Sequence, residues 1–317
     1  RRGDDVARYL ITGGAGFIGA NLAHALVARG ESVRILDDFS TGRLQNLRGI
    51  EDRVEILQGD IRDPGVVAAA VRGIEIILHQ AALNSNPRSI KEPGGTNAVN
   101  VDGTLLLLEA ARAAGTRRVV YASSSSVYGD TPGLPKAEDQ PLSPKAPYGV
   151  SKLAAEFYCR VFSQVYGLET VSLRYFNVFG PRQHPDSEYA AAIPRFLRRM
   201  LAGDRPVIFG DGEQSRDFTA VENVVAANIL AAEAAQGIGE AFNIACGQPS
   251  TLNQLVTWVN QLLGTKLSPI YAAPRPADVR HSYASIHKAE GILGYRPSVD
   301  VQEGLRGTIE WFKAHEC

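Results

Sequence analysis

The sequence predicts an α/β fold, with a doubly wound parallel sheet followed by a smaller C-terminal lobe. From residue 8 to about residue 175, short apolar runs alternate with amphipathic segments, which is typical of repeated strand–helix–strand units. Right-handed crossovers in such a fold place helices on both faces of the sheet. Beyond this point the alternation loosens, and prolines and glycines become frequent. We therefore assign residues 1–175 to the sheet domain and residues 176–317 to the smaller lobe, with some segments of the lobe returning to the sheet.

The order of the elements follows from the hydrophobic pattern. The first strand is expected at residues 9–12, and a helix follows over residues 16–28. Runs rich in valine, isoleucine and leucine predict the other strands at residues 33–36, 54–57, 74–78, 118–122 and 170–174. Helical spacing of apolar residues predicts helices over residues 66–72, 101–114 and 148–166. The lobe is expected to contain helices over residues 193–201, 221–234, 251–263 and 301–313.

The composition is that of an ordinary globular protein without a nucleic-acid partner. The chain has 317 residues, 44% of them hydrophobic and 21% charged, and its formal net charge is −1. A nucleic-acid-binding domain would carry a basic excess or a basic stripe. The three cysteines, Cys159, Cys246 and Cys317, and the six histidines are scattered without metal-ligand spacing. We therefore expect no metal site and no disulfide framework.

The sequence shows no targeting or membrane-spanning segment. Residues 1–8 are charged and lack the apolar stretch of a signal peptide. The longest apolar runs are far below the roughly 20 residues that span a bilayer. We therefore expect a cytoplasmic protein with no membrane partner.

A glycine-rich turn directly follows the first predicted strand. Gly13, Gly16 and Gly19 have the spacing G-x-x-G-x-x-G at the start of the predicted helix. Gly13 permits the tight turn, Gly16 lets the backbone approach a pyrophosphate, and Gly19 lets the helix pack closely on the sheet. The free N–H groups at the helix start then face the phosphate charge. A purely structural turn can look the same, but the position after the first strand favours a dinucleotide site.

An acidic residue closes the second predicted strand, about 20 residues beyond the turn, where such a residue binds the ribose hydroxyls of NAD. A carboxylate at this place also repels the extra phosphate of NADP. Asp37 therefore favours NAD, although a polar residue can also simply close a strand. Two further segments follow strands and are expected to contact the cofactor: Asp60 with Ile61, and Gln80 with Ala81 and Ala82.

A tyrosine and a lysine share one face of a predicted helix. Tyr148 and Lys152 are at positions i and i+4, so their side chains lie on the same side. Hydride transfer from a carbinol needs a base for the hydroxyl proton, and free tyrosine has a pKa near ~10. A nearby ammonium group and a positively charged nicotinamide favour the tyrosinate, so we expect a lowered pKa for Tyr148. Such a pair is usually structural, but the dinucleotide turn favours a catalytic role.

A run of serines follows the strand predicted at residues 118–122. Ser123 to Ser126 place hydroxyl groups at the carboxyl edge of the sheet, where ligands bind in such folds. One of them is expected to hydrogen bond the reacting oxygen, and a polar loop is the alternative. The run itself does not say which serine this is.

Together these stretches resemble the extended short-chain dehydrogenase/reductase family, and within it the NAD-dependent UDP-hexose 4-epimerases. The resemblance covers nearly the whole chain and is closest to the UDP-N-acetylglucosamine 4-epimerase subgroup. It rests on residues 12–19, 123–129, 148–152, 174–180, 215–218 and 275–282, and on Asp37 with Thr41 and Gly42. The family has a Rossmann-type sheet that binds NAD and a C-terminal lobe that binds the UDP-sugar, so the resemblance implies the same division here.

The resemblance also implies a role for each matching residue. Ser124 corresponds to the catalytic serine, Tyr148 to the base and Lys152 to its partner. NAD is the implied cofactor, contacted by Gly13, Gly16, Phe17, Ile18, Gly19, Asp37, Thr41, Gly42, Asp60, Ile61, Gln80, Ala81, Ala82, Asn100, Tyr148, Lys152 and Tyr175. The implied UDP-sugar contacts are Ser85, Arg88, Ser124, Ser125, Ser126, Asn177, Ile208, Phe209, Arg216, Arg275, Asp278 and Ser282.

The implied activity is epimerisation at C4 through a 4-keto sugar. Related dehydratases carry an Asp-Glu pair directly after the catalytic serine or threonine, whereas Ser125 and Ser126 stand there in this chain. Ser282 matches the position that limits the pocket near the C2 substituent, and a small side chain leaves room for an N-acetyl group. UDP-GlcNAc and UDP-GalNAc are therefore the expected substrates, with UDP-Glc and UDP-Gal also accepted, because a size difference of this kind discriminates by only about 1–3 kcal/mol.

Asn84 and Asn86 depart from the family pattern around Ser85. Extra amides could bind a carboxylate, which keeps open a UDP-glucuronate 4-epimerase or another NAD-dependent sugar-nucleotide enzyme, such as a decarboxylase. A non-catalytic NAD-binding regulator is a further alternative, but it should lack the tyrosine or the lysine. Members of the family commonly dimerise through helices equivalent to residues 101–114 and 148–166, so a homodimer is expected.

Overall fold

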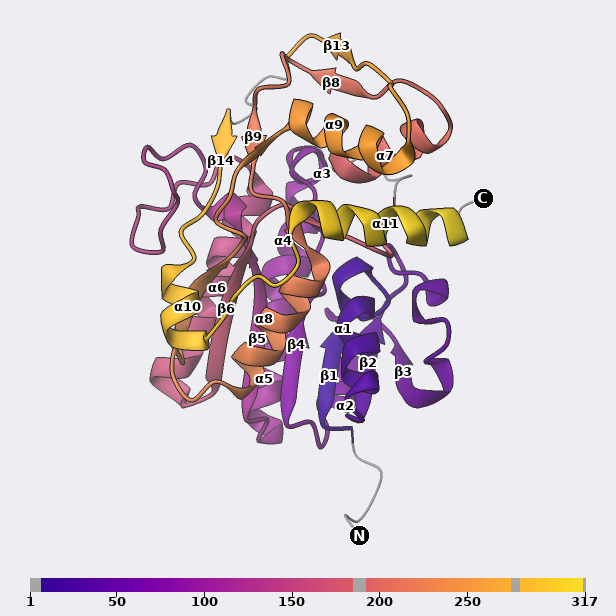
Figure 1. Ribbon diagram of the computed structural model, residues 1–317. Coiled ribbons are helices and arrows are strands. Elements are labelled where there is room, and N and C mark those ends of the chain that lie inside the picture. The colour runs from indigo at the N-terminus through magenta and orange to yellow at the C-terminus, as the bar shows by residue number, and fades with distance from the viewer. Residues whose placement is uncertain (1–6, 185–191, 275–279, 316–317) are drawn as a thin grey trace.

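A parallel sheet forms the centre of the molecule (Figure 1). The computed structural model describes residues 7–184, 192–274 and 280–315. The sheet contains β1 (Tyr9–Thr12), β2 (Val33–Asp37), β3 (Val54–Gln58), β4 (Ile76–His79), β5 (Arg118–Ser124), β6 (Glu169–Tyr175) and β11 (Glu240–Ile244). Their order is β11-β6-β5-β4-β1-β2-β3, and every neighbouring pair is parallel. The predicted doubly wound α/β fold is therefore confirmed.

The central strands are apolar because both of their faces are covered. β1 reads Tyr-Leu-Ile-Thr and β4 reads Ile-Ile-Leu-His, and every residue of both strands is buried. Successive side chains point to opposite faces of the sheet and enter two separate hydrophobic cores, as Leu10 and Ile11 do. A continuous apolar run, rather than alternation with polar residues, is therefore the signature of these strands.

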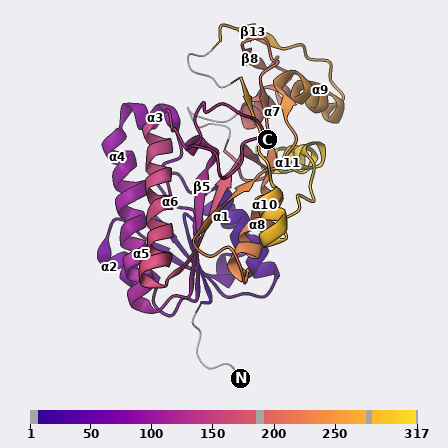
Figure 2. The same ribbon diagram turned by 90° about the vertical axis from the view of Figure 1, so that its left-hand side faces the viewer.

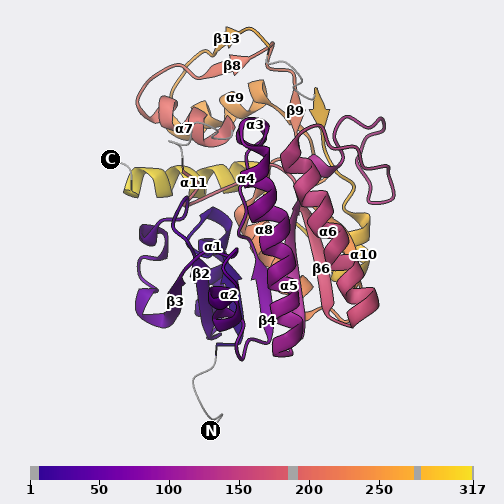
Figure 3. The same ribbon diagram turned by 180° about the vertical axis from the view of Figure 1, so that it is seen from behind.

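Helices cover both faces of the sheet (Figures 2 and 3). One face carries α2 (Pro64–Ala70), α5 (Gly103–Ala114) and α6 (Pro147–Tyr166). The opposite face carries α1 (Phe17–Ala28), α8 (Val221–Glu233) and α10 (His287–Leu293). α8 packs beside α1 and precedes β11, so the C-terminal half of the chain also contributes to the sheet layers.

The smaller lobe lies over the carboxyl ends of the strands (Figure 1). Its helices are α7 (Ala192–Leu201), α9 (Leu252–Leu263) and α11 (Val301–His315), and residues such as Phe196, Leu255 and Leu305 form its core. α9 begins at a capping box between Thr251 and Gln254. The short strands of the lobe are β8 (Val207–Phe209) with β13 (Ile270–Ala272), and β9 (Ser215–Arg216) with β12 (Ser250–Thr251) and β14 (His281–Ser282). β7 (Val178–Phe179) and β10 (Thr219–Ala220) also pair.

The segment between β4 and α5 is helical, which the sequence pattern did not predict. It contains α3 (Asn86–Lys91), α4 (Pro93–Asn97) and a π-helical turn (Ala98–Asp102). Pro87 and Pro93 stand in the first turns of α3 and α4, where a proline is tolerated. Prolines so close together read as a loop in sequence, which explains the difference. Among the described helices, none is long and apolar enough to cross a membrane.

Candidate active site

The carboxyl ends of the sheet strands gather the predicted catalytic and cofactor-binding residues. In a parallel sheet these ends meet at one edge, where ligands of doubly wound folds bind. Gly13 follows β1, Asp37 ends β2, Gln80 follows β4, Ser124 ends β5 and Tyr175 ends β6. The fold therefore brings together residues that are far apart in the chain, at the edge that faces the lobe (Figure 1).

The glycine turn between β1 and α1 has no room for side chains. Gly13 has a left-handed φ of +67°, and a Cβ at this position would lie 2.8 Å from the backbone of Ala81. A Cβ on Gly19 would lie 2.1 Å from the carbonyl oxygen of Gly13. Gly16 is the N-cap of α1, and no side chain caps the helix, whose first turn begins with the half-buried Phe17 and Ile18. The turn thus presents bare backbone at a helix N-terminus, which suits an anion.

Asp37 is buried beside the glycine turn. Its carboxylate accepts hydrogen bonds from the backbone N–H groups of Ala15 and Phe39, both at 2.8 Å. Burial raises the pKa of Asp37, and these hydrogen bonds oppose the rise. Gly42 passes so close that a Cβ would lie 2.6 Å from a carboxylate oxygen, whereas the neighbouring Thr41 is exposed. Asp37 therefore ties the glycine turn to the loop after β2.

The two predicted residues after β3 lie in different surroundings. Asp60 is partly exposed and accepts a hydrogen bond of 3.0 Å from the Arg62 guanidinium, which lowers the pKa of Asp60. Ile61 is buried in the core between the sheet and α5, where it packs against Gly103. Of this pair, only Asp60 keeps its side chain accessible.

Gln80 and Tyr175 hydrogen bond across the end of the sheet. The Gln80 amide lies 3.2 Å from the Tyr175 hydroxyl, and Asn228 of α8 donates to the same hydroxyl at 2.8 Å. Burial raises the pKa of Tyr175 to about 12, so this phenol is neutral at physiological pH. Ala81 and Ala82 are half-buried beside it. Sequence reasoning missed Asn228, because a polar residue in a distant helix gives no local signal.

Asn100 braces the loop after β4 against the start of α6. Its side chain accepts from the Leu83 N–H at 2.8 Å and donates to the Leu83 carbonyl at 3.1 Å. It also donates to the Ser151 hydroxyl at 3.0 Å, and this hydroxyl donates to the Tyr148 carbonyl at 2.8 Å. Asn100 stands in the π-helical turn, a feature that frequently marks functional sites. Both amide hydrogens of Asn100 are thus donated to groups of the protein, the Leu83 carbonyl and the Ser151 hydroxyl.

Ser124 and Tyr148 are neighbours in space. The Tyr148 hydroxyl is hydrogen-bonded to Ser124, which lies at the end of β5, while Tyr148 stands in the first turn of α6. A Cβ on Gly149 would lie only 2.7 Å from the carbonyl oxygen of Ser126. Glycine after the tyrosine therefore lets α6 begin directly against the serine loop.

The strand geometry separates the four serines. Ser123 donates to Glu156 of α6 at 2.7 Å, so its hydroxyl is used inside the helix–sheet interface. Ser124, the next residue, points to the other side of the strand, and its Oγ accepts the N–H of Ser126 at 3.1 Å. Ser125 and Ser126 follow in a 3-10 turn and are half-buried. Alternation along β5 thus selects Ser124 as the partner of the tyrosine.

Lys152 is buried one helical turn after Tyr148. Its Nζ donates to the Ala122 carbonyl at 2.8 Å and lies 5.0 Å from the centre of the Tyr121 ring. Burial lowers the pKa of Lys152 to about 7. Burial also raises the pKa of Tyr148, although the hydrogen bond with Ser124 opposes the rise. The protein's own groups therefore do not supply the lowered tyrosine pKa expected from sequence, because desolvation of the phenolate outweighs them.

His79 is a buried residue that the sequence pattern did not single out. Its Nδ1 lies 2.6 Å from the Thr12 hydroxyl, and its Nε2 lies 2.9 Å from the Thr104 hydroxyl. Burial lowers the pKa of His79 to about 3, so the ring is neutral at physiological pH. The only signal was a polar residue at the end of an apolar strand. His79 joins β1, β4 and α5 below the site.

Two predicted substrate-binding residues of the lobe, one for the diphosphate and one for the sugar, are partners in its small sheet. Arg216 of β9 pairs with Ser282 of β14. The Arg216 guanidinium donates to the carbonyl oxygens of Ser215 and Arg280, at 2.8 and 3.3 Å. The structure therefore places a cation and a small polar side chain next to each other. Arg275 and Asp278 lie outside the described residues.

The remaining predicted substrate residues differ in their surroundings. Asn177 has a left-handed φ of +33°, a strained conformation that often marks functional sites. Ser85 is the N-cap of α3 and accepts from the Arg88 N–H at 3.1 Å. The Arg88 side chain is half-buried. In β8, Ile208 belongs to the core of the lobe and Phe209 is half-buried.

Comparison with known proteins assigns this arrangement to a family. A model described as "NAD dependent epimerase/dehydratase family" matches residues 9–245. The chain belongs to this family. A curated UDP-glucose 4-epimerase of Mycolicibacterium smegmatis is 39% identical over 96% of this chain and 98% of its own length.

Solved structures agree with the assignment to the epimerase/dehydratase family. The UDP-N-acetylglucosamine 4-epimerase from Methanobrevibacter ruminantium M1, in complex with UDP-N-acetylmuramic acid, has a TM-score of 0.93 and 37% identity, covering 98% of this chain and 99% of its own. The UDP-glucose 4-epimerase of Thermus thermophilus, in complex with NAD, has a TM-score of 0.88 and 36% identity, covering 97% and 99%. The predicted Rossmann-type architecture and the predicted family are both confirmed.

NAD is the cofactor of this epimerase/dehydratase family, and the described residues fit it. Gly13 and Gly19 leave no room for a Cβ, as the tight turn and the close helix packing of a pyrophosphate site require, and Gly16 starts the helix with bare backbone. Asp37 stands beside that turn, where a carboxylate can accept hydrogen bonds from ribose hydroxyls. Among the described residues, no group of three His, Cys, Asp or Glu side chains is arranged to hold a metal ion.

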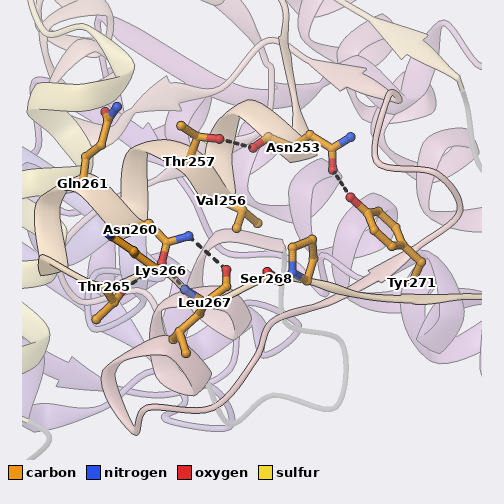
Figure 4. A pocket seen from close by; sticks show the side chains of 11 residues that line it. Asn253, Val256, Thr257, Asn260, Gln261, Thr265, Lys266, Leu267, Ser268 and Tyr271 are labelled. Carbon is orange, nitrogen blue, oxygen red and sulfur yellow. Dashed lines mark hydrogen bonds between the residues drawn. The ribbon is translucent and has the colours of Figure 1, made fainter.

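A cavity of about 420 Å³ lies elsewhere in this epimerase/dehydratase, between α9 and the segment that leads into β13 (Figure 4). Its polar side chains bond within the lobe. The Tyr271 hydroxyl donates to Asn253 at 3.0 Å, and Asn260 donates to the Leu267 carbonyl at 3.0 Å. None of the predicted site residues lines this cavity, so it is separate from the candidate active site.

Proposed function

We propose that this protein is an NAD-dependent 4-epimerase of UDP-hexoses that acts through a 4-keto sugar. The observation that carries the proposal is the grouping of Ser124, Tyr148 and Lys152 at the same sheet edge as the glycine turn and Asp37. Bound NAD supplies an acceptor that takes the C4 hydride and returns it, so the cofactor is restored in each turnover. Return of the hydride to the other face of C4 inverts that carbon.

Tyr148 is the proposed base of this reaction. Its Oη takes the proton of the C4 hydroxyl during oxidation and gives it back during reduction. Ser124 shares a hydrogen bond with the same phenol and is proposed to orient the reacting oxygen. Because burial raises the pKa of Tyr148, phenolate formation depends on positive charge nearby. The Lys152 ammonium and the oxidised nicotinamide are the proposed sources of that charge.

The UDP part is proposed to lie along β9 and β14. Arg216 offers fork-shaped cationic donors of the kind that match a diphosphate. The segment of Ile208 and Phe209 is proposed to lie beside the uracil, with the Ile208 side chain buried in the lobe core and Phe209 half-buried. The strained Asn177 lies at the junction of sheet and lobe. Arg275 and Asp278 are assigned to the same nucleotide site by resemblance.

The residues after Ser124 favour epimerisation over dehydration. Removing water from the sugar requires an acid and a base beside the serine, and related dehydratases use two carboxylates there. Ser125 and Ser126 occupy these positions, and neither hydroxyl is an effective acid or base at neutral pH. The proposed outcome is therefore reduction of the keto sugar.

We propose UDP-GlcNAc and UDP-GalNAc as the preferred substrates, with UDP-Glc and UDP-Gal also accepted. Ser282 is half-buried and small, which supports space for an N-acetyl group at C2. A second candidate, the UDP-glucuronate series, is favoured by Asn84 and Asn86, which are exposed on either side of Ser85. Their amides are suitable donors for a carboxylate.

A homodimer through α5 and α6 is part of the proposal. α6 exposes an apolar stripe whose members are between 38% and 65% exposed: Val150, Phe157, Tyr158, Val161, Val165 and Tyr166. α5 lies next to α6 on the same face of the sheet (Figure 3). An apolar stripe of this kind is typical of an interface, and a twofold axis would bury it against its own copy.

The test uses purified protein with UDP-GlcNAc, UDP-Glc or UDP-GlcA, each followed by proton NMR without added NAD. We expect signals of the C4 epimer, fastest with UDP-GlcNAc. Tyr148→Phe should lower turnover by at least about 10³-fold and still bind the UDP-sugar, whereas Tyr271→Phe, which alters an exposed tyrosine of the lobe away from the proposed site, should keep the wild-type turnover. Release of carbon dioxide from UDP-GlcA, absence of any epimer, or near-normal turnover by Tyr148→Phe would contradict the proposal.

A further inference from the structure

One buried carboxylate of the lobe has no part in the steps proposed above. Asp217 directly follows β9 and is fully buried, at 0% exposure. A carboxylate in such a place needs hydrogen-bond donors or a cation, because an isolated buried charge is costly.

The donors to Asp217 are peptide N–H groups from two other segments of the chain. Cys246 and Gly247, which follow β11, donate to its two oxygens at 2.8 and 2.9 Å. Ala284, which follows β14, donates at 3.3 Å. The backbone N–H of Asp217 in turn donates to the Ser282 carbonyl at 2.9 Å. One side chain therefore joins β9, β14 and the end of β11.

These segments carry different parts of the proposed site. β11 is the outermost strand of the dinucleotide-binding sheet and pairs with β6. β9 and β14 carry Arg216 and Ser282, the proposed contacts of the diphosphate and of the sugar. Asp217 is thus one direct link between the sheet that would hold NAD and the strand pair that would hold the UDP-sugar. A shift of this strand pair would move the sugar relative to the nicotinamide.

The charge state of Asp217 suits this role at neutral pH. Burial raises its pKa to about 6, and its three N–H donors limit the rise. The neighbouring titratable groups are Cys246 and Tyr295, and burial raises the pKa of each, so both are neutral at pH 7. Above pH 6 the group is therefore mainly a carboxylate, which accepts from all three donors.

We infer that Asp217 is a positioning residue for UDP-sugar binding, which fixes the Arg216–Ser282 strand pair against the end of the dinucleotide-binding sheet. The inference rests on the proposed function of that strand pair. Asp217 is not expected to contact the substrate. Its replacement should therefore change the affinity for the nucleotide rather than the rate of the chemical step.

Asp217→Asn tests the inference, because it replaces one acceptor oxygen with an NH2 group that faces peptide donors. We expect the Kd for UDP, measured by titration calorimetry on the NAD-loaded protein, to rise at least about tenfold, which equals about 1.4 kcal/mol. The KM for the UDP-sugar should rise similarly, while kcat changes less than about threefold. The NAD content should stay that of the wild type, since the glycine turn and Asp37 are unchanged.

Asn260→Ala is the matched control for a merely structural effect. Asn260 also joins segments of the lobe, through hydrogen bonds with Thr265 and Leu267, but it touches neither β9 nor β14. It should lower the Tm while leaving the Kd for UDP unchanged. Equal weakening of UDP binding in both variants, or unchanged UDP affinity in Asp217→Asn, overturns the inference.

A second variant keeps the test open if Asp217→Asn does not fold. Ala284→Pro removes one N–H donor and leaves the carboxylate in place. It should weaken UDP binding about threefold or more, and unchanged affinity speaks against the inference. Failure of the wild-type protein to bind UDP would refute the proposed nucleotide site itself, and wild-type UDP binding without epimerisation would refute only the proposed reaction. The two kinds of failure are therefore distinguishable.

Discussion

Glu156 and Arg174 form an ion pair of 2.6 Å in which each side chain is only 2% exposed. Glu156 lies on α6, one turn after Lys152, and Arg174 lies on β6. The pair is hydrogen-bonded on both sides, by Ser123 at 2.7 Å and by the Tyr128 hydroxyl at 2.7 Å. Since α6 also carries Tyr148, the ion pair fixes the helix with the proposed base against the strands below it.

Glu156→Gln should destabilise the protein by about 3–5 kcal/mol, because it leaves the buried Arg174 without a counter-charge. The free energy of unfolding from urea denaturation measures the effect. Glu55→Gln is the control, since Glu55 is 50% exposed in its pair with Arg34 and its loss should cost less than about 1 kcal/mol. Similar losses of unfolding free energy in the two variants would show that the buried pair stabilises the fold no more than the exposed pair does.

Gly19→Ala should abolish NAD retention. The new Cβ would lie 2.1 Å from the carbonyl oxygen of Gly13, so the turn must open and lose its fit to a pyrophosphate. Chromatography of the nucleotide released by heating the purified protein measures the NAD content. Gly291→Ala, in α10 with no atom near the new Cβ, should retain the wild-type content. Full NAD content in Gly19→Ala would rule out the assigned turn.

Lys152→Met should change stability in a pH-dependent way. The folded lysine has a pKa of about 7, against about 10.4 in the unfolded chain, so below pH 7 the fold carries a buried ammonium group at a cost. Between these values the unfolded state binds the extra proton, and the stability of the wild type rises with pH. The free energy of unfolding of Lys152→Met, relative to that of the wild type, should therefore be highest at pH 6. This difference should fall by on the order of 3 kcal/mol between pH 6 and pH 10.

Denaturation of both proteins at several pH values tests this expectation. Lys288→Met, which removes a partly exposed lysine, serves as the control and should show no comparable trend. A stability difference between Lys152→Met and the wild type that is constant from pH 6 to pH 10 would mean that Lys152 is fully charged in the fold.

Ser282→Tyr should shift the sugar preference away from N-acetylated substrates. A bulky ring in β14 would fill the space proposed for the N-acetyl group, so kcat/KM for UDP-GlcNAc should fall about 10- to 100-fold relative to UDP-Glc. Steady-state rates with both sugars give the ratio. Ser282→Ala, which stays small, should keep the ratio within about threefold of the wild type. If Ser282→Tyr leaves the ratio of the two kcat/KM values unchanged, the C2 substituent does not lie beside residue 282.

Val161→Glu with Val165→Glu should convert the proposed dimer to a monomer. These residues are 43% and 65% exposed on the apolar stripe of α6, and carboxylates there would be buried against a second copy. Light scattering after size-exclusion chromatography gives the molar mass. Ile270→Glu, on the exposed part of the lobe, is the control and should leave the mass unchanged. A wild-type protein that elutes as a monomer refutes this part of the proposal.

The amino-acid sequence by itself determined the features that depend on neighbours along the chain. Apolar runs such as Ile76–His79 predict buried strands, since both faces of a parallel sheet are covered. Gly13, Gly16 and Gly19 predict a phosphate turn, because the required backbone geometry excludes side chains locally. The two short helices within residues 86–97 were not predicted, because prolines are typical of loops. In the structure these prolines occupy first-turn positions of the helices, where proline is tolerated.

Only the tertiary structure decided which distant groups meet. Nothing in the serine run distinguishes Ser123 from Ser124, but the pleat of β5 sends one hydroxyl to Glu156 and leaves the other beside Tyr148. The tyrosine pKa follows from burial by the whole fold, which no local pattern records. The donors to Asp217 come from residues about 30 to 70 positions later in the chain. Contacts of this range depend on how the strands are ordered, and short-range periodicity carries no information about that order.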